Sequence, residues 1–274
     1  MKKIGACCLF FLVPLLAFAE SESVHRLEYN LDGAYRFDGD EWLAEHTLQY
    51  DYKVSSDYSL ETQVKFHTNY IRDEENPEWH NDNEHHFARV RLYGPTFAEV
   101  LGFTSRWAMQ YTLPTSEEYQ KAGNYGALGA RVYFEREFNK NFNLSIVPIV
   151  QVVLNRNGSQ VNDPARERNE LGSAAINIAP QLVLGSLTLT YDSLLGVAVE
   201  GHAPGESNIQ STGIYEGDLE LLNNFESLGD LGLGVFFAHS FAFGKGAAAH
   251  DSHGNFLHIS ESYAGLRIIK GFDL

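Results

Sequence analysis

The sequence predicts an all-β fold, a twelve-stranded antiparallel transmembrane β-barrel. The stretch "YSLETQVKFHTNY", residues 58–70, alternates apolar and polar side chains without interruption, which is typical of a β-strand. Tyr58 and Tyr70 end its apolar face, and the strand between them spans roughly 40 Å. Tilted by about 45°, it rises about 28 Å, close to the ~25 Å apolar band between the aromatic girdles of membrane barrels. Strands of soluble proteins are shorter, usually about 5–6 residues.

The first nineteen residues are expected to be a signal peptide. Lys2 and Lys3 precede the apolar run "CLFFLVPLLAFA", which ends in the small-x-small pattern Ala17-Phe18-Ala19. The run is too short for a transmembrane helix. Cys7 and Cys8 stand before the apolar run, where a lipoprotein cysteine would not be. The prediction is therefore a signal peptide at 1–19 and a cysteine-free barrel domain at 20–274.

Twelve stretches of the chain show this alternation, residues 58–70 among them. They lie near residues 24–37, 42–54, 58–71, 86–94, 99–113, 125–138, 142–154, 170–184, 187–199, 214–225, 230–243 and 256–272. Every second connection is a tight turn: "SSD", "GPTF", "NKN", "GS" and "ESLG". The others are longer, except the first, "DGDE". An even number of strands with short turns at one rim and long loops at the other is the pattern of bacterial outer-membrane barrels.

The last strand adds a family resemblance. The segment "SYAGLRIIKGFDL" places Leu266, Ile268, Phe272 and Leu274 on one face, and it resembles the C-terminal strand that the outer-membrane assembly machinery recognises. Its final Leu stands where that signal usually has Phe. Over residues 20–274 the chain resembles a Gram-negative outer-membrane β-barrel of the porin-like kind. The resemblance implies short periplasmic turns, longer extracellular loops, and outer-membrane lipid, lipopolysaccharide and the assembly machinery as partners.

Composition excludes other classes of function. The chain has 36 acidic residues against 20 Lys and Arg, a formal net charge of −16, which argues against a nucleic-acid partner. The absence of a composition break predicts one barrel domain, and no cofactor is expected.

Pro148 and Pro180 fall within predicted strands, where each leaves a ladder bond unmade, and together they suggest a bulge on neighbouring strands. Arg136 is expected on the lipid face near the turn at Asn139, within reach of headgroups.

The inward faces carry charges that cluster by sign. A basic wall is predicted near mid-height on the third to sixth strands, formed by Lys65, Arg89, Arg91, Arg106 and Arg131. An acidic wall is predicted across the barrel on the ninth and tenth strands, formed by Asp192, Glu216, Asp218 and Glu220. Such facing walls resemble the constriction zone of general porins, and they predict a narrow aqueous channel for passive diffusion of small hydrophilic solutes. The sign of its ion selectivity stays open.

The same charges allow a second interpretation. A barrel of this size lies between eight-stranded barrels, which their own side chains fill, and sixteen-stranded ones, which hold a channel. Arg91 could pair with Glu61 or Glu135 in a closed network, and the barrel would then be a plugged structural or adhesive protein.

Catalysis and metal binding are not expected. "HDSHG" (250–254) resembles the His-x-Ser-Asn-Gly signature of outer-membrane phospholipase A, with Ser252 as nucleophile and His250 as base, but His253 replaces the asparagine. His239 and Ser240 in "FFAHSF" resemble part of a lipid A deacylase pattern, with Phe241 in the wrong place. The acidic loop "RDEENPEWHNDNEHH" lacks the regular spacing of a calcium site. The loop "PTSEEYQKAGN" has no residue that proves it folds into the pore.

Overall fold

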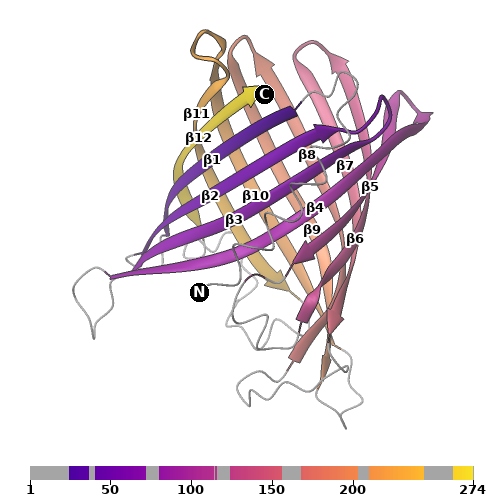
Figure 1. Cartoon of the computed structure of the whole chain (residues 1–274), viewed down its shortest axis with the longest axis vertical. Coiled ribbons are helices and arrows are strands. Elements are labelled where there is room, and N and C mark those ends of the chain that lie inside the picture. The colour runs from indigo at the N-terminus through magenta and orange to yellow at the C-terminus, as the bar shows by residue number, and fades with distance from the viewer. Residues whose placement is uncertain are drawn as a thin grey trace.

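The chain folds into a closed β-barrel. The computed structural model describes residues 25–36, 41–71, 80–113, 115, 124–155, 168–202, 210–243 and 262–273. The strands are β1 (His25–Arg36), β2 (Glu41–Lys53), β3 (Ser59–Ile71), β4 (His80–Val100), β5 (Phe103–Leu113), β6 (Asn124–Asn139), β7 (Phe142–Asn155), β8 (Arg168–Leu184), β9 (Leu187–His202), β10 (Gln210–Phe225), β11 (Leu231–Phe243) and β12 (Tyr263–Asp273). Each pairs antiparallel with its sequence neighbours, and β1 closes onto β12 (Figure 1). The predicted fold class is confirmed.

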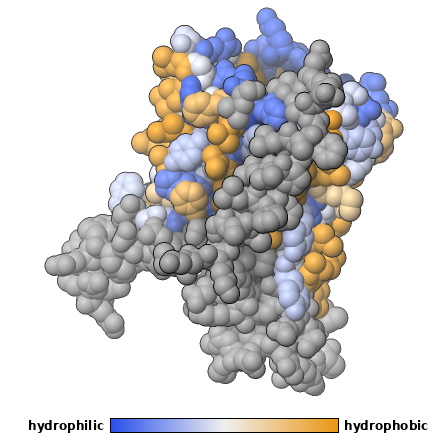
Figure 2. Space-filling view, in the orientation of Figure 1, coloured by the Kyte–Doolittle hydropathy of each residue, from blue (hydrophilic) through white to orange (hydrophobic). Residues whose placement is uncertain are grey.

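The two faces of the wall separate as the alternation predicts. On β3, Val64 and Phe66 are 39% and 37% exposed, whereas Glu61 on the other face is 5% exposed. Tyr58 at the start of this row is exposed as well. Large apolar residues of the other strands are also exposed, and Figure 2 shows them in orange on the outer surface. The apolar side chains therefore face outward, and the polar ones face the lumen.

Five short turns join the strands at one end of the barrel, which lies at the top of Figure 1 beside the C-terminal end of β12. Four of them lie where the sequence predicts. The β8–β9 turn contains Gly185 at φ 65°, a left-handed conformation that favours glycine. The β10–β11 turn contains the 3₁₀-helix η2 (Glu226–Leu228), after which the Gly229 N–H donates to the Glu226 carbonyl. Among the described residues, no helix is long and apolar enough to cross a membrane.

The predicted turn "GPTF" is wrong. Strand β4 continues through Gly94 and Pro95 to Val100, and the chain turns at Leu101 and Gly102, both at positive φ. The pairing with β5 shifts register between Tyr93 and Ala98, so this segment is a β-bulge. A bulge leaves a residue unpaired and accommodates a proline that cannot donate to the ladder. The other end of β4 is also longer than predicted, since the strand starts at His80 rather than near residue 86.

The two strand prolines do not mark a bulge. The β6–β7 ladder skips Pro148, running from Arg131–Ile149 to Phe134–Ile146 with no change of register. The β8–β9 ladder skips Pro180 in the same way. Between β7 and β8, Pro148 pairs with Ile176 and Pro180 pairs with Leu144, so the prolines lie four positions apart. Each proline interrupts the ladder with one neighbouring strand only. The ladder with the other neighbouring strand continues past it, so the register is kept.

Candidate functional site

The predicted basic residues lie on the lumen face of four neighbouring strands, β3 to β6. Strand pairing fixes their relative heights, because Glu61 lies opposite Arg91, and Arg91 opposite Gln110. Two residues further along β4, Tyr93 lies opposite Ala108, which in turn lies opposite Arg131. The alternation of side chains along each strand directs these groups to one side.

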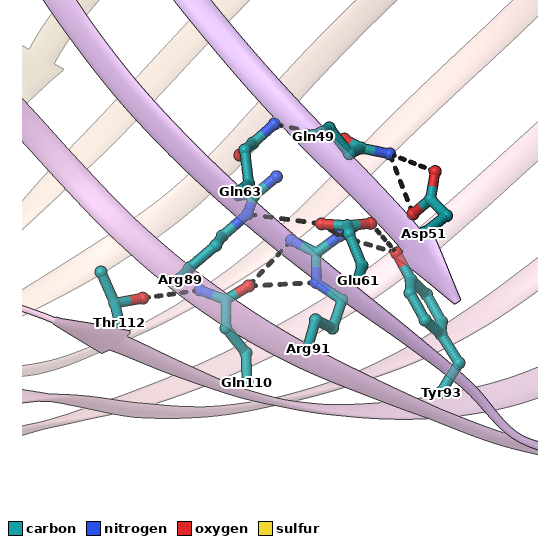
Figure 3. A network of polar contacts seen from close by, with 9 residues as sticks. All are labelled: Gln49, Asp51, Glu61, Gln63, Arg89, Arg91, Tyr93, Gln110 and Thr112. Atoms are coloured by element: carbon teal, nitrogen blue, oxygen red, sulfur yellow. Dashed lines mark hydrogen bonds and ion pairs between the residues drawn. The ribbon is translucent and has the colours of Figure 1, made fainter. Parts of the chain in front are cut away.

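Arg91 is the centre of a hydrogen-bonded network (Figure 3). Its guanidinium lies 3.2 Å from Glu61 Oε1 and donates to Gln110 Oε1 at 2.8 Å and to the Tyr93 hydroxyl at 2.8 Å. The Tyr93 hydroxyl donates to Glu61 Oε2 at 2.7 Å. Arg91 and Glu61 are each only 5% exposed. Of the two partners predicted for Arg91, Glu61 is the observed one, and Glu135 forms no ion pair with it.

The other members of the basic wall differ in how they are neutralised. Arg89 Nε lies 3.5 Å from the same Glu61 carboxylate, and Lys65 Nζ lies 2.6 Å from Glu45. Arg106 has no carboxylate partner among the described residues, and its guanidinium carbon lies 4.5 Å from the ring centre of Tyr93 and 5.7 Å from that of Tyr133. The wall is thus interrupted by two carboxylates that the sequence analysis did not place in it.

The predicted acidic wall also holds a cation. Asp192, Asp218 and Glu220 lie on the lumen faces of β9 and β10, with Asp192 and Asp218 directly opposite each other. Arg267 on β12 contacts Glu220 through Nη1 and lies 3.5 Å from Asp218. Its other side forms a bidentate pair with Asp32 on β1, at 2.7 and 2.8 Å.

Sequence reasoning missed Arg267 because the last strand was examined only for its apolar face. The signal was present, since Arg267 alternates with Leu266 and Ile268 and so must face the lumen. Asp32 was missed for the same reason on the first strand. Glu216, the fourth predicted acidic residue, is exposed and lies on the lumen face of β10.

Two of the cavities inside the barrel are lined by the predicted charged residues. The first cavity has a volume of about 460 Å³. Lys65 and Glu45 line one side of it, and Asp192, Asp218 and Arg267 line the other. The basic and acidic walls therefore meet across this cavity. The second, about 720 Å³, lies at the short-turn end, where its lining includes Ser55–Ser59 together with Tyr93, Arg106 and Arg26. Arg26 is paired with Glu28 at 3.3 Å.

The candidate catalytic residues do not form a site in the described part of the chain. The ring of His239 packs against those of Tyr215 and Phe237, and the adjacent Ser240 points to the opposite face of β11. His250, Ser252 and His253 lie outside the described residues, as do residues 72–79 of the acidic loop and the segment 116–123. Within the described ranges, no group of three or more His, Cys, Asp or Glu could hold a metal ion.

Arg136 lies near a turn on the outer face, as expected. It donates to the Leu101 carbonyl at 2.6 Å and lies 4.4 Å from the ring centre of Phe138. Its charge thus supports the β4–β5 turn, whose carbonyl oxygen accepts the bond.

Comparison with solved structures places the barrel in a structural class. A NanC porin shares 12% sequence identity over 90% of this chain and 99% of that chain, with a TM-score of 0.54. An outer-membrane channel from Pseudomonas putida F1 shares 9% identity over 91% of this chain and 95% of that chain, with a TM-score of 0.55. No family model and no curated protein matches the sequence. The chain therefore has the architecture of a porin-like outer-membrane β-barrel.

Proposed function

We propose that this chain is a channel of the Gram-negative outer membrane through which ions and small hydrophilic solutes diffuse passively. The observation that carries the proposal is the 460 Å³ cavity, which charged side chains of β2, β3, β9, β10 and β12 line from facing sides. Two carboxylates of this lining, Asp192 and Glu216, form no ion pair with a described residue, and they favour water over a dry packed interior because unneutralised charges are costly to bury. The field between the walls would order water and retard apolar solutes. The proposal assigns no catalysis to the barrel.

Planar-bilayer recording tests this function directly. Refolded protein is expected to insert and give discrete, equal steps of conductance in potassium chloride, because an aqueous path carries ions. Folded protein, identified by its shifted gel mobility before heating, that gives no steps over ±150 mV would contradict the proposal. Liposome swelling with neutral sugars of increasing size measures the same path without an applied voltage.

A plugged structural or adhesive barrel is the second candidate. The network of Arg91, Glu61, Tyr93 and Gln110 favours it, since these side chains neutralise and hydrogen-bond one another with little exposure. The bilayer recording separates the two candidates, because a plug gives a silent, fully folded protein. Swelling of liposomes that is no faster with the protein than without it points to the plug as well.

The location is part of the proposal. We infer that residues 1–19 direct export and that the assembly machinery recognises β12, whose outer face carries Leu266, Ile268 and Phe272. When the chain is expressed with its C-terminus unchanged, we expect heat-modifiable protein in the outer-membrane fraction. Removal of residues 2–19 should leave the protein in the cytoplasm, and recovery in the outer membrane after that deletion would contradict the assignment.

A further inference from the structure

We propose that the lumen contains a binding subsite for small organic carboxylates, formed by Arg106 and Arg131 beside the rings of Tyr93 and Tyr133. The inference rests on the proposed channel function, because it names the class of solute that the channel prefers. It concerns the second cavity, at the short-turn end, which Arg106 and Tyr93 line.

Aromatic rings hold Arg106 in place without occupying its hydrogen-bond donors. Its guanidinium carbon lies 4.5 Å from the ring centre of Tyr93 and 5.7 Å from that of Tyr133, and the two ring centres are 5.7 Å apart. Cation–π attraction acts on the face of the guanidinium, whereas its N–H groups lie at its edge. No described residue accepts a hydrogen bond from Arg106. A positioned guanidinium with free donors is suited to bidentate binding of a carboxylate.

No described carboxylate contacts Arg106 directly, although Asp51, Asp57 and Glu61 also line the second cavity. Of these three, Glu61 is already in contact with both Arg89 and Arg91. Neither Arg106 nor Arg131 forms an ion pair with any carboxylate that the structure describes. Because these strands lie side by side, their positive charges add along one side of the lumen and attract anions.

Arg131 lies close enough to share a ligand with Arg106. Tyr133 is opposite Arg106, and Arg131 is two residues from Tyr133 on the same face of β6. Diagonal neighbours of this kind are about 7–8 Å apart at the backbone, a distance that two long arginine side chains can bridge around one carboxylate.

The test compares gluconate with sorbitol, a neutral polyol of the same chain length. Millimolar gluconate added to one side is expected to reduce the single-channel current of the unmodified protein, and sorbitol is not. Arg106→Gln removes the charge but keeps a long polar side chain. We expect it to weaken the gluconate block about tenfold, which corresponds to about 1.4 kcal/mol, and to move the reversal potential toward cation preference.

The matched control is Arg26→Gln, which makes the same charge change in the same cavity at a residue paired with Glu28. It is expected to leave the block unchanged. Equal weakening by both variants, or no weakening by Arg106→Gln, would overturn the subsite while the conductance steps still support the channel.

A binding measurement separates the subsite from conduction. Saturation-transfer NMR on the folded protein in detergent should detect gluconate but not sorbitol, and Arg106→Gln should abolish the gluconate signal. Binding by a barrel that never conducts would support the subsite and contradict the channel. Absence of gluconate binding to the unmodified protein would overturn the subsite whatever the conductance.

Discussion

At the scale of single residues, Glu61 has more contacts with the basic wall than any other carboxylate described there. It neutralises Arg91, contacts Arg89 and accepts a hydrogen bond from Tyr93. Its 5% exposure means that little water reaches it, so the loss of its charge would leave two guanidinium groups in a poorly hydrated place. Removal of one partner from a buried ion pair is usually more harmful than replacement of both.

Glu61→Gln is therefore expected to destabilise the barrel. We expect a loss of about 3 kcal/mol in the free energy of unfolding, at the low end of the usual range because lumen water can hydrate the freed groups. Urea unfolding in lipid vesicles measures the change. Glu135→Gln is the control, because Glu135 is exposed and has no ion pair with a described residue. A loss under about 0.5 kcal/mol for Glu61→Gln, the size usual for a surface substitution, would contradict the assignment.

At the scale of elements, the bulge in β4 depends on the absence of a side chain at Gly94. A Cβ at this position would lie 2.0 Å from the Trp107 ring, so the ring lies directly against the glycine backbone. Trp107 also makes an edge contact with the Tyr58 ring, at 6.3 Å between centres. The bulge, the indole and the start of β3 therefore form one packed unit.

Gly94→Ala is expected to displace this indole. Overpacking of this kind costs about 1–3 kcal/mol, and tryptophan emission should shift as the ring moves. Gly33→Ala is the matched control, because nothing lies within 4 Å of a Cβ built at Gly33. Unchanged emission and unfolding for Gly94→Ala would show that the ring is not confined by the glycine.

The bulge also shows where prediction from sequence stopped. Alternation of side chains predicted the strands and their faces. A shift of one residue would turn all apolar side chains of a strand into the lumen, so the alternation has to be kept along each strand. "GPTF" looked like a turn because Gly and Pro favour both turns and bulges. Local sequence does not distinguish them. The distinction depends on β5, which continues to pair with β4 beyond Pro95.

The seam between β1 and β12 has its own ion pair. Arg267 joins Asp32 on the first strand to Asp218 and Glu220 on the tenth. Arg267→Gln leaves three carboxylates facing one another without a cation, and we expect a loss of about 3 kcal/mol in unfolding free energy. Arg267→Lys should recover part of it, and Lys140→Gln, at an exposed turn, should have no effect. Equal stability of Arg267→Gln and the unmodified barrel would contradict the role of this cluster.

At the scale of the whole molecule, the wall separates an apolar outer surface from a charged interior. This much followed from the sequence, and the same alternation directs the nine predicted charged residues inward. Of the ion pairs, that of Arg91 with Glu61 was one of two predicted alternatives, whereas Glu45, Asp32 and Arg267 were not assigned to the walls. The stagger between neighbouring strands decides which charges neutralise each other. Alternation along a single strand does not reveal this stagger.

Cysteine labelling compares the two surfaces of the complete barrel. Glu216→Cys faces the first cavity, and Leu219→Cys on the same strand is 44% exposed on the outer face. In membranes, a charged, membrane-impermeant thiol reagent is expected to modify Glu216→Cys at least about tenfold faster than Leu219→Cys, because ionised reagents are excluded from hydrocarbon. Equal rates would contradict either the wet lumen or the lipid contact.

Arg267 has a consequence for how the ring is completed. Arg267, the cation that binds Asp218 and Glu220, lies on the final strand, and it also binds Asp32 on the first strand. A ring that shut one strand early, with β1 beside β11, would bring three carboxylates together with no counter-ion of their own. Repulsion among these carboxylates disfavours closure with eleven strands. Arg267 therefore favours closure of the barrel with all twelve.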